Sequence, residues 1–373
     1  MATPKTIAVV IHSLGGGGAE RTLVDLTACW AARGDRVTII TLSHARDDAY
    51  PLHPDINRVV LDVAGASTGL LQGLLANLGR VLALRKEFKA IAPDVALGFM
   101  TTSSVLAVFA ALGLPIRVIA SEHTHPTHQS LSPLWRVLRK VAYPLARAVV
   151  TLTEGTALWI KANMPGVHLR VIPNPVVWPV ANGEPVLQPP SKIAQRKRLL
   201  AVGRLHPEKG FDLLIEAFRL IAAQKSEWDL VILGDGSARS TLQAQIEQAD
   251  LVRRIDMPGR VGNMADWYAS ADMYVLSSRV EGLSNTLLES MAMGLPVVSF
   301  DCDTGPRAII THGVDGILVR PDGDSMALAQ ALLGLIDDEP LQQKLRTDAP
   351  RVRERFSLAS VIARWDQLLE EVE

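Results

Sequence analysis

Two hydrophobic patterns alternate along the first half of the chain. Short, fully apolar runs at residues 6–12 (TIAVVIH) and 37–42 (VTIITL) are typical of buried strands, whereas residues 22–32 have the apolar spacing of a helix. Further strand-like runs follow at residues 59–63, 94–98, 118–120, 149–152 and 171–175. Buried strands that alternate with helices predict a doubly wound α/β sheet, in which the strands run parallel.

The second half repeats this alternation after a stretch of different composition. Residues 179–198 hold four prolines and few large apolar side chains, which is typical of a linker. Strand-like runs then begin at Leu199, with a helix over residues 211–223, and an amphipathic helix is expected at residues 357–373. We therefore predict two facing Rossmann-like domains, at 1–178 and 199–356, with a cleft between them. The last helix is expected to pack back toward the first domain.

Composition narrows the class of protein. The 373 residues are 48% hydrophobic and 21% charged, and no apolar run reaches the length of a membrane-spanning helix. The first strand-like run starts at Thr6, so no signal peptide is expected. Cys29 and Cys302 lie far apart in apolar surroundings and predict core thiols in a reducing cytoplasm.

The net charge of −1 conceals an asymmetry between the halves. Residues 1–178 carry 17 Lys and Arg against 11 Asp and Glu, while the remainder carries 21 against 28. Basic residues gather near the end of an apolar helix at 69–88 and throughout residues 131–148. The second segment is compatible with binding to an anionic membrane surface, and equally with a helix that packs on its own sheet and keeps a solvated basic face. No feature points to nucleic acid.

The stretch EGLSNTLLESMAMGLP, residues 281–296, is the most informative. Asn285 is a good N-cap, so the amides of Thr286, Leu287 and Leu288 are expected to be unpaired at a helix N-terminus, where an anion such as a diphosphate binds. Glu289 would lie one turn into that helix, at a distance suited to the two hydroxyls of a ribose, and Glu281 on the preceding loop would face the group beyond the phosphates. Two solvated surface glutamates are the alternative.

Arg204 and Lys209 flank the turn after the first strand of the second domain. Both are expected at the carboxyl edge of the sheet, together with residues 281–289. Two cations beside a helix N-terminus suit a diphosphate leaving group, which carries about two negative charges. Either residue alone would fit a structural salt bridge.

Glycines and histidines mark the corresponding edge of the first domain. Gly15–Gly18 follow the first strand and allow backbone amides to approach a ligand, although they lack the spacing of a dinucleotide fingerprint. The histidines at 123, 125 and 128 do not have the spacing or partners of a metal site. His123 follows a strand directly and is expected to line the cleft.

Taken together, these motifs resemble those of a known family. VGRL-x3-KG at 202–210, GDG at 234–236, GRV at 259–261 and the E-x7-E stretch have the order seen in retaining nucleotide-sugar glycosyltransferases of the GT-B fold, family 4. GGGGAER and PVVSFDC-x2-GP are similar to bacterial members that build lipid-linked oligosaccharides or surface polysaccharides. Ser284 and Ala308 depart from the family, which often has proline and glutamate there.

The resemblance implies a role for each candidate residue. Arg204 and Lys209 would hold the donor diphosphate, Glu281 the transferred sugar, and His123 would lie near that sugar. The remaining donor-binding residues would be Gly17, Gly18, Gly234, Arg260, Asn285, Thr286, Leu287 and Glu289. The donor is expected to be a UDP-N-acetylhexosamine or another UDP-hexose, with GDP-mannose next, and the acceptor a glycan or a polyprenyl-diphosphate-linked glycan. The protein would be cytoplasmic or peripheral on the inner membrane face.

Neither a cofactor nor a metal is expected. Asp301 and Asp303 form a D-x-D that holds a metal in other transferases, but Arg204 and Lys209 already supply positive charge. Two other functions are compatible with the sequence. A nucleotide-sugar 2-epimerase would turn over without an acceptor, and a nucleotide-binding protein without activity would consume no donor. A nicotinamide-dependent dehydrogenase is disfavoured because neither Gly-rich turn has the fingerprint.

Overall fold

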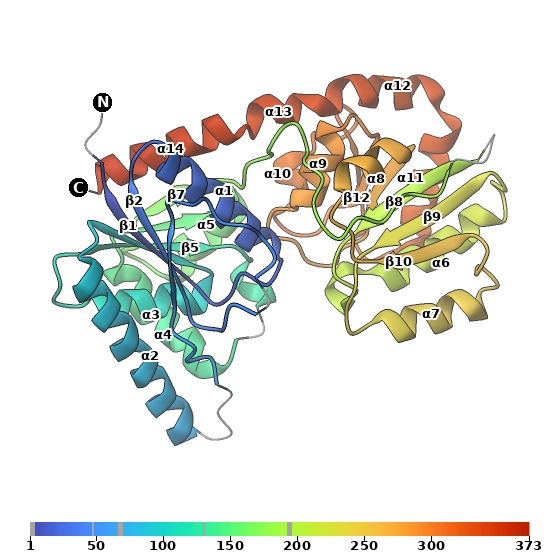
Figure 1. The fold of residues 1–373 in the computed structure, drawn as a ribbon. Coiled ribbons are helices and arrows are strands. Elements are labelled where there is room, and N and C mark those ends of the chain that lie inside the picture. Colours follow the sequence, from blue (N-terminus) through green and yellow to red (C-terminus); the bar gives the residue numbers. More distant parts are fainter. Residues whose placement is uncertain (1–3, 47, 66–69, 130, 192–195, 373) are drawn as a thin grey trace. The chain divides into compact units, whose positions relative to one another are not determined.

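The computed structural model describes residues 4–372, apart from 47, 66–69, 130 and 192–195. The chain divides into two compact units, each with its own sheet (Figure 1). Unit 1 comprises residues up to Asn174 together with the last segment from Leu358, and unit 2 comprises Pro175–Ser357. Within the described part, no helix is long and apolar enough to span a bilayer. Each unit is a doubly wound α/β structure, as predicted.

The sheet of unit 1 has seven parallel strands in the order β3-β2-β1-β4-β5-β6-β7. Their bounds are β1 Thr6–Ile11, β2 Arg36–Thr41, β3 Asn57–Val60, β4 Val95–Phe99, β5 Arg117–Glu122, β6 Ala148–Thr151 and β7 Leu169–Val171. The order reverses between β1 and β4, where Ile7 pairs with Val95. In such sheets the crevice for a ligand lies at the carboxyl ends of the strands on either side of this reversal.

Helices cover both faces of this sheet. They are α1 Gly18–Ala32, α2 Leu70–Ile91, α3 Thr101–Ala111, α4 Pro133–Ala142, α5 Glu154–Asn163 and α14 Leu358–Glu371. Ile7, Val9 and Ile11 of β1 pack with residues of α1 and α14, whereas Ala8 and Val10 pack with α2, α3, α4 and α5. This alternation explains why β1 reads as an uninterrupted apolar run, since both of its faces are buried.

The last helix completes the core of unit 1. Trp365 of α14 packs edge-on against Trp30 of α1, with 6.1 Å between the ring centroids, and stacks on Phe99 at the end of β4, at 6.3 Å. At the surface, Arg33 forms ion pairs with Asp366 of α14 and with Asp35. The C-terminal helix is therefore an integral part of this unit.

Unit 2 contains six parallel strands in the order β10-β9-β8-β11-β12-β13. The bounds are β8 Lys197–Val202, β9 Trp228–Leu233, β10 Ile255–Gly259, β11 Met273–Leu276, β12 Val297–Phe300 and β13 Ile317–Val319. Its helices are α6 Phe211–Ala222, α7 Arg239–Gln248, α8 Met264–Ser270, α9 Asn285–Ala292, α10 Pro306–Ile309, α11 Ser325–Asp337, α12 Glu339–Asp348 and α13 Val352–Arg355. One face packs against α6, α7, α11 and α12. The order reverses between β8 and β11.

The proline-rich stretch after Pro175 belongs to unit 2. The Gly183 amide donates to the carbonyl of Gly262, and the Gly262 amide donates back to Pro185, at 2.9 and 2.7 Å. The indole of Trp267 in α8 donates to the carbonyl of Leu187. These hydrogen bonds hold the stretch beside the segment that follows β10.

Candidate functional site

Several predicted site residues of unit 2 lie after strands at the carboxyl edge of its sheet. Arg204 and Lys209 follow β8, Gly234 follows β9, Arg260 follows β10, and Glu281 follows β11. Because β8 and β11 are neighbours on either side of the strand-order reversal, the loops after these two strands border the crevice of the sheet.

Lys209 and Glu281 meet at this point. The Lys209 ammonium lies 2.6 Å from Oε1 of Glu281, and the Ser278 hydroxyl donates to the same oxygen at 2.8 Å. The Glu281 side chain is buried, and that of Lys209 is mostly buried. Two residues 72 positions apart, which were expected only to share a sheet edge, are therefore in direct contact, in a place where charges are weakly screened by water.

Gly210 makes this contact possible. It has a left-handed backbone, with φ +62°, and a Cβ built on it would lie 2.1 Å from the carbonyl oxygen of Ser277. The Ser277 hydroxyl in turn donates to the carbonyl of Lys209 at 3.0 Å. Only glycine permits so close an approach of the two backbones without a shift, which is the physical reason for the KG dipeptide.

Helix α9, Asn285–Ala292, begins one residue earlier than expected. Ser284, not Asn285, is the N-cap, and its hydroxyl accepts from the amide of Leu287 at 3.4 Å. The Leu288 amide donates to the Ser284 carbonyl. The prediction of three unpaired amides is thus wrong for Leu287 and Leu288, because the cap lies before Asn285. Thr286 is the remaining position of the three from which an amide can donate to a ligand.

Glu289 lies one turn into α9, as predicted, and is buried. Its contact with a ribose stays a prediction. Its Oε2 accepts from the hydroxyl of Tyr268 in α8 at 2.9 Å. A second buried tyrosine, Tyr274 of β11, donates to the Thr286 hydroxyl at 2.8 Å. Burial, and then the negative charges of Glu281 and Glu289, raise the pKa of Tyr274, which keeps this phenol protonated as a donor.

The other basic and glycine positions differ in their surroundings. The Arg204 side chain is 73% exposed and pairs with Glu208 at 3.0 Å, so the structure does not join it to Lys209 and Glu281. Arg260 is exposed after β10. Gly234 has φ +137°, and a Cβ there would lie 1.9 Å from the carbonyl of Gly203, so the first glycine of GDG lets the loops after β8 and β9 approach.

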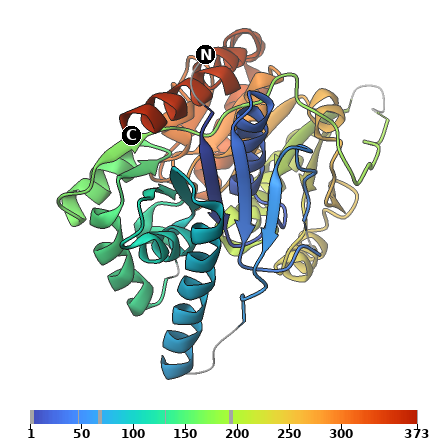
Figure 2. The same cartoon turned by 60° about the vertical axis from the view of Figure 1, so that its left-hand side comes forward.

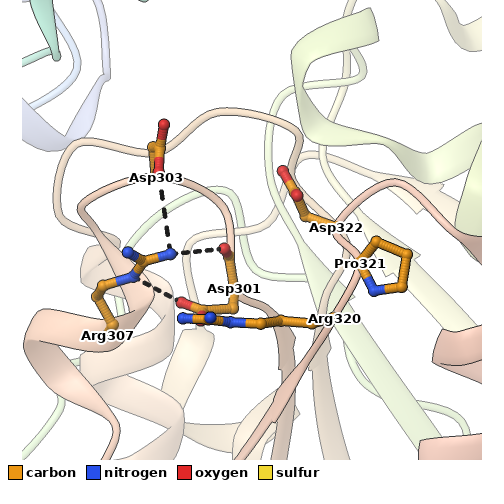
Figure 3. A pocket seen from close by; sticks show the side chains of 6 residues that line it. All are labelled: Asp301, Asp303, Arg307, Arg320, Pro321 and Asp322. Atoms are coloured by element: carbon orange, nitrogen blue, oxygen red, sulfur yellow. Dashed lines mark hydrogen bonds and ion pairs between the residues drawn. The ribbon is translucent and has the colours of Figure 1, made fainter.

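A polar cavity of about 470 Å³ lies beyond the ends of β12 and β13 (Figure 3). Its floor is Asp301, whose buried carboxylate pairs with Arg307 at 2.9 Å and with Arg320 at 2.5 Å. Asp303, Pro321 and Asp322 complete the lining. Both oxygens of Asp301 already face a guanidinium. Among the described residues, no cluster of three or more His, Cys, Asp or Glu side chains could hold a metal; the absence of a metal requirement stays a prediction.

Cys302 follows Asp301 and is buried near Glu281. Burial, together with the nearby negative charge of Glu281, raises the pKa of its thiol to about 12. The loop that carries it is tied to Glu281 by a bridge between Glu281 and Thr304. Cys302 is therefore an inert core thiol, because the reactive thiolate is not formed near neutral pH.

In unit 1, the glycine run leads directly into α1. Gly17 is the N-cap and Gly18 the first helical residue, and Gly16 has φ +93°. The predicted phosphate-binding glycines thus lie at the N-terminus of a helix of fifteen residues, at the carboxyl end of β1 beside the strand-order reversal.

His123 follows β5 at the same edge of unit 1. The ring is buried, and its Nε2 lies 3.0 Å from the hydroxyl of Ser121, whereas Nδ1 has no hydrogen-bond partner in the part of the chain described. Burial lowers the pKa of His123 to about 4, so the imidazole is neutral at neutral pH. If Nε2 accepts from Ser121, Nδ1 carries the proton and is the donor that a ligand could use.

The residue before His123 is one that the sequence reasoning missed. Glu122 is fully buried and accepts from Thr101 at the start of α3, from Tyr143 at 2.7 Å and from Gln129 at 2.5 Å. Burial raises its pKa, against the hydrogen bond from Tyr143 and the charge of Arg139. This network holds the loop that carries His123. The sequence signal that could have identified Glu122 is a carboxylate at the end of the largely apolar run that forms β5.

The two units match two models of one enzyme group. Residues 16–177 match the model described as "Glycosyltransferase Family 4", and residues 196–338 match the model described as "Glycosyl transferases group 1". The matches fall on the two α/β sheets and include all of the candidate site residues.

Individual relatives agree over the whole length. A Campylobacter jejuni enzyme is 28% identical over 368 residues, 98% of each chain, and is named as an α-1,4-N-acetyl-D-galactosaminyltransferase that acts on GalNAc-α-1,4-GalNAc-α-1,3-diNAcBac-PP-undecaprenol. A second C. jejuni enzyme, a diphospho-undecaprenol 4-α-N-acetylgalactosaminyltransferase, is 25% identical over 365 residues, 95% of this chain and 96% of its own.

Solved structures establish the fold. Sucrose-phosphate synthase from Thermosynechococcus elongatus superposes with a TM-score of 0.85 at 17% identity, over 99% of each chain. HepE of Anabaena, solved in complex with UDP and glucose, has a TM-score of 0.78 at 20% identity, over 98% of this chain and 99% of its own. Both the fold and the family suggested by the motifs are thus confirmed: the chain belongs to the group 1, family 4 glycosyltransferases and has the GT-B fold.

Proposed function

We propose that this glycosyltransferase moves a sugar, with retention of anomeric configuration, from a UDP-N-acetylhexosamine or another UDP-hexose to a glycan carried on a polyprenyl diphosphate. The observation that carries the proposal is the buried contact between Lys209 and Glu281 at the strand-order reversal of unit 2. In this contact the Lys209 ammonium, which would bind the diphosphate, lies next to the Glu281 carboxylate, which would bind the sugar. The names of the two C. jejuni relatives support the choice of N-acetylhexosamine and of a lipid-linked acceptor.

Lys209 stabilises the leaving group in this proposal. In the unliganded protein its charge is balanced by Glu281, so arrival of a diphosphate adds negative charge to a site that already orients the ammonium. Thr286 at the start of α9 contributes a main-chain donor and the positive end of the helix. As the bond to the sugar breaks, charge grows on the departing phosphate oxygen, and these fixed donors stabilise that state more than the ground state.

Glu289 and Glu281 recognise the two ends of the donor. The Glu289 carboxylate, oriented by Tyr268, accepts from ribose hydroxyls, while the backbone near Arg260 contacts the base. Both Lys209 and Ser278 contact Oε1 of Glu281, which leaves Oε2 to accept from a hydroxyl of the sugar. A carboxylate held in this way positions the sugar and does not act as a covalent nucleophile.

The chemical step exchanges one bond at the anomeric carbon. The bond to the diphosphate oxygen breaks, the acceptor oxygen bonds from the same face, and the acceptor proton passes to the departing phosphate oxygen. The neutral His123 contacts the transferred sugar, and Nδ1 is the donor if Nε2 accepts from Ser121; the amides at Gly17 and Gly18 contact the phosphates.

A thermal-shift panel of nucleotide-sugars tests the donor site, because a ligand stabilises in proportion to the logarithm of its concentration over its Kd. We expect a shift with a UDP-sugar that K209A and E289Q abolish. K225A and E216Q are matched controls, since Lys225 and Glu216 pair with Asp337 and Arg219, away from the strand-order reversal. An intact shift in both K209A and E289Q would contradict the site.

Product analysis tests the reaction. With a polyprenyl-diphosphate glycan, we expect a glycosylated product whose new linkage has the anomeric configuration of the donor sugar. Turnover of the donor without any acceptor to an epimeric nucleotide-sugar would show a 2-epimerase instead. Tight binding without consumption of donor, across a panel of acceptors, would show a nucleotide-binding protein without this activity.

A further inference from the structure

Helix α2 of unit 1 exposes a row of leucines to solvent. Leu74, Leu75, Leu78 and Leu82 are 52%, 66%, 54% and 57% exposed, and we call them the leucine stripe. Scattered exposed leucines are ordinary on a protein surface, but four on three successive helical turns are not. The stripe therefore needs an explanation of its own.

The geometry of α2 separates the stripe from the core. At about 100° per residue, the four leucines fall within an arc of about 100°. Leu84 and Phe88, by which α2 packs on the sheet layer, are fully buried and lie outside this arc, about 80° and about 40° from its Leu74 edge. Figures 1 and 2 show the N-terminal part of α2 projecting beyond α3 and α4.

Basic side chains continue the same face. Lys86 and Lys89, both exposed, follow the leucines in the same or an adjoining sector of α2. In the same helical layer, α4 exposes Arg136 and Lys140 beside Val137 and Val141, which are 58% and 51% exposed. Leucines flanked by lysines match a bilayer with anionic headgroups, in which apolar side chains enter the acyl region and ammonium groups remain at the phosphates.

We infer that the leucine stripe inserts into an anionic lipid bilayer, with Lys86 and Lys89 at its headgroups. The inference rests on the proposed function, because a polyprenyl-linked acceptor is itself held in a membrane. Helix α2 begins after the carboxyl end of β3, so the stripe lies toward the sheet edge that carries Gly17 and His123. Insertion of α2 brings that edge to the lipid surface where the acceptor glycan emerges.

Vesicle flotation of the full chain tests the inference. We expect the protein to float with phosphatidylglycerol vesicles and much less with pure phosphatidylcholine vesicles. The variant L74Q/L78Q/L82Q should lose at least about tenfold in affinity, since three inserted leucines are removed. The control L158Q/V252Q/M326Q changes three side chains of similar exposure, 64%, 56% and 52%, and should bind like the unmodified protein.

A charge reversal separates lipid binding from a folding defect. K86E/K89E leaves the leucines in place and should weaken binding to phosphatidylglycerol vesicles, and the loss should grow at low salt. The thermal shift with the UDP-sugar is measured on every variant. The shift should be the same in every variant, because the stripe is not part of the donor site. If the unmodified protein itself shows no shift with a UDP-sugar, the proposed function is wrong.

Two results would overturn the inference. One is equal vesicle binding by the stripe variant, the control variant and the unmodified protein, or no binding by any of them. The other is a concentration-dependent dimer, seen by sedimentation, that L74Q/L78Q/L82Q converts to monomer while vesicle binding is absent. That outcome would assign the stripe to contact with a second copy of the chain.

Discussion

Single residues in this protein set both chemistry and stability, and His123 shows how. Because burial lowers its folded pKa to about 4, while an unfolded histidine titrates near 6.5, the folded state loses stability as the pH falls through that interval. Glu122 acts in the opposite direction, since burial raises its pKa and protonation favours the folded form. The two effects overlap in any single denaturation curve.

We therefore predict the pH dependence of the difference in unfolding free energy between the unmodified protein and the variant H123Q. Between about pH 7.5 and about pH 5, the unmodified protein should lose about 2 kcal/mol of unfolding free energy more than H123Q, because the glutamine cannot be protonated. Urea denaturation at several pH values measures this difference. Parallel pH profiles for the two proteins would contradict the assignment of a buried neutral imidazole.

A second prediction at the residue scale concerns metal. Donor turnover should survive EDTA, because Lys209 supplies positive charge and the Asp301 carboxylate is held by two arginines. The measurement is initial rate after chelation, compared with rate after addition of Mg²⁺ or Mn²⁺. Abolished activity that either cation restores would show that this reasoning is wrong.

Gly210 provides a third test. We expect G210A to destabilise the protein by more than about 2 kcal/mol, because it combines an unfavourable left-handed backbone with a methyl group placed against the Ser277 carbonyl. G313A is the control: Gly313 has φ +72° but open space around its Cβ, so it reports backbone strain alone. If G210A and G313A lose the same stability in thermal denaturation, the close approach of Gly210 to the Ser277 carbonyl has no energetic effect.

At the scale of elements, the cap of α9 links stability to ligand binding. S284A should lower the unfolding free energy by about 1 kcal/mol, because the Leu287 amide loses its acceptor. D324A removes the cap of α11, where Asp324 accepts from Met326 and Ala327, and should cost a similar amount. Only S284A should alter the thermal shift with a UDP-sugar. If S284A and D324A show the same shift, the cap of α9 is not part of the donor site.

Elements with both faces buried were the easiest to predict. The apolar run 6–12 became β1 Thr6–Ile11, and the helix expected at 211–223 is α6 Phe211–Ala222. The segment 131–148 was predicted as one helical stretch, but α4 ends at Ala142 and a 3₁₀ turn containing Pro144 follows. Helix α3 was not predicted, because its sequence TTSSVLAVFAA is apolar or small on all sides and lacks a clear period.

The candidate-site residues that could be predicted are those that belong to short sequence motifs. Lys209, Glu281 and Glu289 could be proposed because strand, loop and helix signals place them at one sheet edge. Tyr268 and Tyr274 could not, because each is a buried aromatic in sequence, and its hydrogen bond depends on which helix packs beside which strand. The N-cap was misplaced by one residue, since Ser284 and Asn285 are both good caps and only the backbone distinguishes them.

At the scale of the whole molecule, unit 1 is built from both ends of the chain. Trp365 of α14 contacts Trp30 and Phe99, so W365A should destabilise unit 1 by about 3 kcal/mol or more. W178A is the control, because Trp178 belongs to unit 2, is 43% exposed and stacks under Arg353. Hydrogen exchange of β1 and β4 amides measures the effect, and slow exchange maintained in W365A would contradict it.

The return of α14 to unit 1 also sets the order in which the nascent protein can be completed. Unit 2 is continuous from Pro175 to Ser357, so it has all of its parts once that segment has left the ribosome. At that moment unit 1 still lacks Val361, Trp365 and Leu368 of its hydrophobic core, because α14 is synthesised after unit 2. Although its first strand is synthesised before any other, unit 1 is thus the second of the two to have all of its residues available.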